Sequence, residues 1–347
     1  MECIAVAMTE TQLKETIKNG GANLYVFYGA ESYLVEQYAR LVAKQTVEEG
    51  FDAFNFQRFD GQSVTPEQLE EAVESLPMMS DRKCVSVRDI TLTADNSDRI
   101  LRMVEQMPES TVLVLWQMTV QPDKRKNAWK DLLNIAEKKG VAMEFKRKDP
   151  ADAAKMLMAG AKRRGCNLDF TDASYLVEQV GNDLNLLIGE LDKLCALAVN
   201  GDVTRKLIDT ACPKNLEARV FDLSKAILRR KAGEAYDLLH QFKTQREEPV
   251  PVLAVLSGAY ADLYRAKVAA GAGVPAERLA AEFKSYKGKE WKLKNAARDS
   301  ARMSLPVLRD CLDILAKADL TLKSSPGDPW VVLEQTVTRL MNRAAEG

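Results

Sequence analysis

Short apolar runs rich in β-branched and aromatic residues mark the first 149 residues of this 347-residue chain and stop there. Runs of this length and composition are typical of buried strands. The five predicted strands are Leu24–Tyr28, Phe54–Phe59, Cys84–Arg88, Thr111–Trp116 and Val141–Phe145. A helical segment separates each run from the next, and parallel strands need such crossover connections. This alternation predicts an α/β domain with a mostly parallel sheet.

The helices between these strands carry recognisable start signals. Thr9–Gln12 has the pattern of a capping box, and Thr65 precedes Pro66 as an N-cap precedes a first-turn proline. After a short first helix, the predicted helices are Ser32–Glu49, Pro66–Ser75, Ser97–Met107 and Lys124–Lys139.

Helical periodicity replaces the strand pattern after Lys146–Pro150. One apolar stripe comprises Leu184, Leu187, Ile188, Leu191, Leu194 and Ala198; others comprise Val220, Leu223 and Ile227, and Leu308, Leu312, Leu315 and Leu320. Cys212–Asn215 is a second boundary. We therefore expect three domains: an α/β domain over 1–148, a small helical domain over 149–212 and a larger helical domain over 213–347.

Composition excludes several kinds of site. A single histidine, His240, rules out any centre that needs two. The cysteines are too scattered for a zinc ribbon or a redox pair, and we expect reduced thiols in a cytoplasmic protein. They are Cys3, Cys84, Cys166, Cys195, Cys212 and Cys311. No apolar run approaches ~18 residues and no secretory leader is apparent, so we expect no membrane partner.

The net charge of −1 conceals a segregation of charge along the chain. Residues 1–149 carry −5 and residues 150–212 carry −2, whereas residues 213–347 carry +6. Such segregation indicates that the two ends meet different partners.

The loop after the first strand lies where a nucleotide-binding domain places its phosphate loop. A working loop needs several glycines and a lysine. Gly29-Ala30-Glu31-Ser32 has one glycine, no lysine or arginine, and a glutamate that would repel phosphate. The ends of two further strands, residues 88–90 and 117–119, offer no paired carboxylates for magnesium. We expect a degenerate, non-functional nucleotide loop and no cofactor.

Five segments of the sequence resemble, in order, the delta subunit family of the bacterial DNA polymerase III clamp loader. They are Leu24–Glu36, Leu76–Arg88, Gly181–Leu194, Val220–Leu228 and Ala316–Lys323. The resemblance implies an AAA+-like sheet domain without a working nucleotide site, a helical lid and a helical collar. It also implies a non-enzymatic part of a DNA-directed DNA polymerase holoenzyme. The implied partners are the sliding clamp (beta subunit), the tau/gamma and delta-prime subunits, and primed DNA.

Met78 and Met79 are the leading candidates for a binding site. Neighbours on a helix differ by ~100°, so both cannot face one core from a regular helix, whereas a turn can display both. The resemblance implies that this pair, with Leu76 and Pro77, is the hydrophobic wedge that enters a pocket on the clamp. The family usually has larger or aromatic side chains here, and flexible methionine is a tolerable departure. The alternative is that both methionines pad this protein's own sheet.

A basic stretch, residues 278–302, is the second candidate. Eight lysines and arginines face three acids there, and Phe283, Tyr286 and Trp291 are interleaved with them. Such a patch can meet DNA phosphates without reading sequence. The candidate DNA contacts are Lys284, Lys287, Lys289, Lys292, Lys294 and Arg298. The alternative is a solvated helical face whose aromatics anchor it to the bundle.

Two other functions stay open from the sequence. One is an α/β nucleotide-dependent enzyme with a helical substrate domain, which ATP or NAD binding would reveal. The other is a different AAA+-like replication adaptor, which a pull-down against the clamp would distinguish from a clamp-loader subunit.

Overall fold

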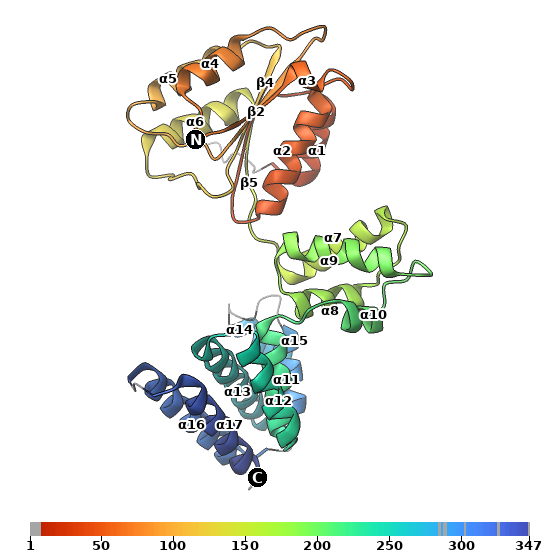
Figure 1. Ribbon diagram of the computed structural model, residues 1–347, viewed down its shortest axis with the longest axis vertical. Coiled ribbons are helices and arrows are strands. Elements are labelled where there is room, and N and C mark those ends of the chain that lie inside the picture. Colours follow the sequence, from red (N-terminus) through yellow and green to blue (C-terminus); the bar gives the residue numbers. More distant parts are fainter. Residues whose placement is uncertain (1–7, 284–285, 287–289, 302, 325–326, 346–347) are drawn as a thin grey trace. The chain divides into compact units, whose positions relative to one another are not determined.

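The chain forms two compact units that join between Lys148 and Asp149 (Figure 1). The computed structural model describes residues 8–283, 286, 290–301, 303–324 and 327–345. The lysines at 284, 287 and 289 lie outside the described residues. The three-domain division into 1–148, 149–212 and 213–347 stays a prediction.

A five-stranded parallel sheet, in the order β2-β3-β4-β1-β5, organises the first unit. The strands are β1 Leu24–Tyr28, β2 Phe56–Asp60, β3 Lys83–Arg88, β4 Thr111–Trp116 and β5 Val141–Glu144. The predicted parallel sheet is therefore confirmed. All five residues of β1 and all six of β4 are buried, as expected for strands covered on both faces.

Helices cover both faces of the sheet. Helix α2 (Ser32–Thr46) packs on β1, β3 and β4 and carries α1 (Glu10–Lys18) on its outer side. The other face is covered by α4 (Pro66–Glu74), α5 (Ser97–Gln106) and α6 (Asn127–Lys139) (Figure 1). Thr9 and Thr65 both close capping boxes with a glutamine three residues on, which confirms the predicted helix starts.

The prediction of a strand from Phe54 was wrong at its start. Residues Asp52–Asn55 form a helical turn, α3, and β2 begins only at Phe56. The reason is tertiary: the side chain of Asn55 is buried and bonded to a segment 23 residues away, which fixes the chain in a turn. Sequence periodicity carries no trace of that contact.

Within its described residues, the second unit consists of helices joined by turns, with one isolated β-bridge between Asn167 and Asp202. It begins with α7 (Pro150–Arg163), α8 (Phe170–Val180), α9 (Leu184–Leu197) and α10 (Arg205–Ala211). Leu184, Leu187, Leu191 and Leu194 form the buried stripe of α9, as their spacing predicts. The carboxylates of Asp149, Asp169 and Asp183 cap α7, α8 and α9.

Longer helices complete this unit. They are α11 (Leu216–Leu228), α12 (Ala232–Thr244), α13 (Pro249–Gly271), α14 (Ala276–Glu282), α15 (Glu290–Asp299), α16 (Leu305–Ser324) and α17 (Pro329–Ala345). Val220, Leu223 and Ile227 lie in their shared core, as predicted. Leu320 does not, because it lies ~140° around the helix from buried Leu315 and is exposed. Within the described residues, no helix is long and apolar enough to cross a membrane.

Candidate functional site

The loop between α4 and β3 displays the most exposed cluster of large apolar side chains in the first unit. Leu76, Met78 and Met79 are 80%, 54% and 83% exposed, and Pro77 between them is half-buried. The four candidate residues thus lie together in one loop, residues 76–79, which we call the docking loop. The alternative that both methionines pad this protein's own sheet does not hold.

A buried carboxamide holds the centre of the docking loop. The backbone N–H of Met78 donates to Asn55 Oδ1 at 2.8 Å, and Asn55 Nδ2 donates to the carbonyl of Met78 at 2.8 Å. Asn55 is fully buried at the end of α3. Two such bonds from one rigid group fix the backbone of the loop, because losing them would leave polar groups unsatisfied.

The docking loop also contains an unusual backbone conformation. Met79 has a φ of +52°, in the left-handed region that non-glycine residues seldom adopt. Such residues cost on the order of 1–3 kcal/mol and persist where their surroundings over-determine them. The turn directs two neighbouring thioethers to solvent, which a regular helix could not do.

Both flanks of the docking loop are tied to the sheet domain. On one side, the ammonium of buried Lys83 donates to the carbonyl of Ala72 and to Ser75 Oγ, each at 2.6 Å. Burial lowers the pKa of Lys83 to about 8. On the other side, the guanidinium of Arg82 donates to the carbonyl of Gly20 at 3.1 Å and to the side chain of Asn23. The loop is therefore a rigid display rather than a free segment.

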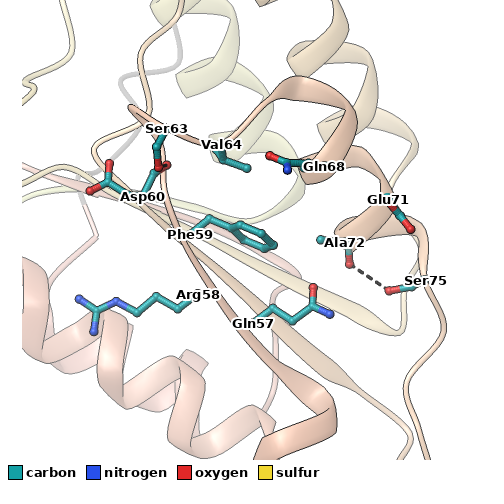
Figure 2. A pocket seen from close by; sticks show the side chains of 10 residues that line it. All are labelled: Gln57, Arg58, Phe59, Asp60, Ser63, Val64, Gln68, Glu71, Ala72 and Ser75. Carbon is teal, nitrogen blue, oxygen red and sulfur yellow. Dashed lines mark hydrogen bonds between the residues drawn. The ribbon is translucent and has the colours of Figure 1, made fainter.

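A groove of about 690 Å3 borders the docking loop between β2 and α4 (Figure 2). Its lining is mainly polar and consists of Gln57, Arg58, Phe59, Asp60, Ser63, Val64, Gln68, Glu71, Ala72 and Ser75. Ala72 and Ser75 lie at the end of α4 that leads into Leu76. The lining of the groove therefore ends at the residue that precedes the docking loop.

The loop predicted to be a degenerate nucleotide loop, residues 29–32, lies at the opposite, carboxyl end of the strands. Other parts of the chain occupy its hydrogen-bonding groups. The N–H of Gly29 donates to Gln121 Oε1, and the N–H of Glu31 donates to the carbonyl of Phe145, each at 3.0 Å. A Cβ on Gly29, whose φ is +126°, would lie 2.4 Å from the same carbonyl. In a working phosphate loop, backbone N–H groups face the phosphate. Two of those in residues 29–32 are already bonded.

Glu31 adds an electrostatic obstacle to phosphate. It is the N-cap residue of α2, and its buried carboxylate accepts from the N–H of Lys148 at 3.2 Å. A helix N-terminus is where a phosphate would be held. An acidic side chain in that position disfavours one.

The carboxylate at the end of β3 is committed to the protein's own backbone. Asp89 Oδ1 accepts from the N–H groups of Met118, Thr119 and Val120 at 2.6, 2.8 and 3.1 Å. Burial by itself raises the pKa of Asp89, but these hydrogen bonds together hold that pKa below its usual value. Among the described residues, no group of three or more His, Cys, Asp or Glu side chains could hold a metal ion.

The described part of the basic stretch lines a cavity of about 960 Å3 in the second unit. Lys292, Lys294 and Arg298 on α15 share that cavity with Arg205, Lys214 and Lys225. Lys292 is largely buried, pairs with Glu217 at 3.0 Å and lies over the ring of Phe221. Lys294 and Arg298 are exposed. The structure thus brings three of the six candidate lysines and arginines together, with mixed charge around them.

Sequence reasoning missed Asn55 and its neighbour Phe54, which is 58% exposed. The only signal was the aromatic segment Phe51–Phe56, which resembles a strand. Nothing in the spacing connects that segment to the docking loop.

Comparisons with known proteins agree with this fold. Residues 25–146 match the family model "DNA polymerase III, delta subunit", and residues 217–340 match the family's C-terminal domain. DNA polymerase III subunit delta of Bacillus subtilis is 24% identical over 340 residues, covering 95% of this chain and 96% of the relative. The Escherichia coli subunit is 20% identical over 330 residues, covering 93% of each. The solved structure of the Bacillus subtilis DNA clamp loader delta protein matches with a TM-score of 0.53, at 22% identity, over 96% of this chain and 99% of the other.

Proposed function

The chain belongs to the DNA polymerase III delta subunit family of clamp-loader components, and from that premise we propose that its docking loop binds the sliding clamp and opens the ring. The observation that carries the proposal is the pair Met78 and Met79, exposed on a turn that three sets of hydrogen bonds hold in place. An apolar pair fixed in solvent is costly for a monomer unless another surface covers it.

The work of ring opening comes from differential binding. A ligand shifts an equilibrium only by the difference between its affinities for the two states. The docking loop binds the ring better when one ring interface is opened or strained, and so raises the population of that form. Methionine suits this task because its flexible thioether adapts to a pocket that changes shape.

This chain acts without hydrolysing ATP itself. The bonded N–H groups of Gly29 and Glu31, the buried Glu31 carboxylate and the engaged Asp89 all argue against a working nucleotide site. They also count against an enzyme built on this domain. ATP-binding partner subunits, of the tau/gamma type, then expose or cover the docking loop.

The second unit supplies assembly and DNA contact. Residues 213–347 serve as the collar that holds the chain in a ring with tau/gamma and delta-prime subunits, and residues 149–212 serve as the lid. The positive charge of the collar, and exposed Lys294 and Arg298 in particular, support an additional contact with primed DNA.

A titration of the cognate sliding clamp by isothermal calorimetry tests the proposal. We expect the wild-type chain to bind without added nucleotide and the Met78→Ala/Met79→Ala variant to bind at least 30-fold more weakly, since each exposed thioether contributes ~1–2 kcal/mol on burial. Leu186→Ala/Leu197→Ala is the matched control, because it removes two side chains of similar exposure (60% and 50%) from α9. Equal affinity of the methionine variant and the wild type would refute clamp binding through this loop.

A further inference from the structure

We infer that the surface that binds the sliding clamp has two apolar anchors, the docking loop and Phe54 on α3. Buried Asn55 links the two, because it follows Phe54 in the chain and bonds to the backbone of Met78. The inference rests on the proposed function and extends it to a residue outside the loop. Phe54 is 58% exposed although it belongs to a short helix at the margin of the sheet. Phe54 therefore offers a further exposed apolar side chain, next in the chain to the residue that bonds to the docking loop.

Asn55 fixes the distance between the two anchors. Its side chain makes both 2.8 Å bonds to the backbone of Met78, and Phe54 is its neighbour in the chain. The Asn55 side chain reaches the Met78 backbone through its hydrogen bonds, and the Cα atoms of Phe54 and Asn55 are about 3.8 Å apart. The Cα of Phe54 therefore lies within ~10 Å of the Met78 backbone. A phenylalanine and a methionine side chain can span that separation over one contact surface.

The topology places both anchors at the same end of the sheet. Phe54 comes just before β2 begins at Phe56, so it lies at the amino end of that parallel strand. The docking loop lies in the connection from the end of α4 to the start of β3, so it is at the amino end of the adjacent strand.

The chemistry of the two anchors is complementary. An aromatic ring gives a large contact area at a small cost in side-chain entropy, and such residues dominate many interfaces. The thioethers adapt in shape, whereas the ring is rigid. The partner surface that fits is therefore the apolar pocket of the clamp that binds the methionines, together with an adjoining apolar area that binds the aromatic side chain of Phe54.

Calorimetric titration of the clamp with a Phe54→Ala variant of the full chain tests the inference. Because Phe54 is 58% exposed and can be buried on binding, we expect affinity to fall about 5- to 20-fold. Phe170→Ala on α8 is the matched control, since that phenylalanine is 47% exposed in the second unit, and it should leave affinity unchanged. Thermal unfolding of each variant checks that the fold persists.

The outcomes separate this inference from the proposal on which it rests. If the methionine variant loses clamp affinity and Phe54→Ala does not, the docking loop stands and the second anchor is refuted. If neither variant loses affinity, the proposed function itself fails. If Phe54→Ala alters self-association of the chain in sedimentation but not clamp affinity, the Phe54 side chain contacts a second copy of the chain and the inference is overturned.

Hydrogen exchange gives an independent reading. Clamp binding should slow exchange at the backbone amides of residues 51–56 as well as at those of residues 76–82. Slowing confined to residues 76–82 would contradict a second anchor.

Discussion

Replacing Asn55 with alanine should loosen the docking loop while leaving its apolar side chains unchanged. The variant Asn55→Ala removes both 2.8 Å hydrogen bonds to Met78 and leaves the part-buried N–H and carbonyl of that residue without them. Each such group costs ~1–3 kcal/mol. Because water can reach the margin of a surface loop, we expect the lower part of that range for each, or about 2–4 kcal/mol of lost stability.

The same variant should weaken clamp binding. A loosened loop has to be ordered again on docking, and fixing even two residues costs ~2–4 kcal/mol. That corresponds to a loss of roughly 30-fold or more in affinity. Urea unfolding measures the loss of stability, and calorimetric titration of the clamp measures the loss of affinity. Hydrogen exchange at residues 76–82 measures the loosening of the loop that links the two.

The exposed Asn200 offers a control that lies far along the chain, since Asn200→Ala should change none of the three readings. Unchanged exchange at residues 76–82 in Asn55→Ala, or full clamp affinity despite faster exchange, would refute the idea that a rigid display matters.

Three further changes test other parts of the account. Gly29→Ala should lower the free energy of unfolding by about 2–5 kcal/mol, because a Cβ there meets the carbonyl of Phe145 at 2.4 Å and φ is +126°; a variant as stable as wild type in urea would contradict the close approach. Burial lowers the pKa of Lys83 from 10.5 to about 8, so between these pH values the unfolded chain binds more protons than the folded chain. The stability of the wild type relative to Lys83→Met should therefore rise with pH over that range. A difference in unfolding free energy that does not depend on pH would contradict the lowered pKa. Lys294→Ala/Arg298→Ala should reduce the salt slope of primed-DNA binding by up to about 2, and an unchanged slope would exclude both from the phosphate contacts.

Much of the sheet domain follows from local physics. The apolar runs at Leu24–Tyr28 and Thr111–Trp116 are rich in β-branched and aromatic residues and lie between helical segments, so they fit buried parallel strands. The exposure of Met78 and Met79 follows from the ~100° between neighbours on a helix, which leaves a turn as the place where both can be displayed.

The features that escape the sequence are tertiary. Asn55 acts through backbone atoms of Met78, and such a contact imposes no pattern on the intervening residues. Phe54 and Asn55 lie in an aromatic segment that resembles a strand but form a helical turn, in which the contact with Met78 holds Asn55. Charge counting likewise grouped Lys292 with the candidate DNA contacts, whereas it packs over Phe221 and pairs with Glu217.

A sliding clamp with a fluorophore pair across each ring interface reports whether the proposed ring opening occurs. Adding the wild-type chain in the absence of nucleotide should lower the energy transfer between the pair, whereas the Met78→Ala/Met79→Ala variant should leave it high. Unchanged transfer at a concentration of wild-type chain that saturates the clamp would contradict the account, and so would an equal fall with the variant.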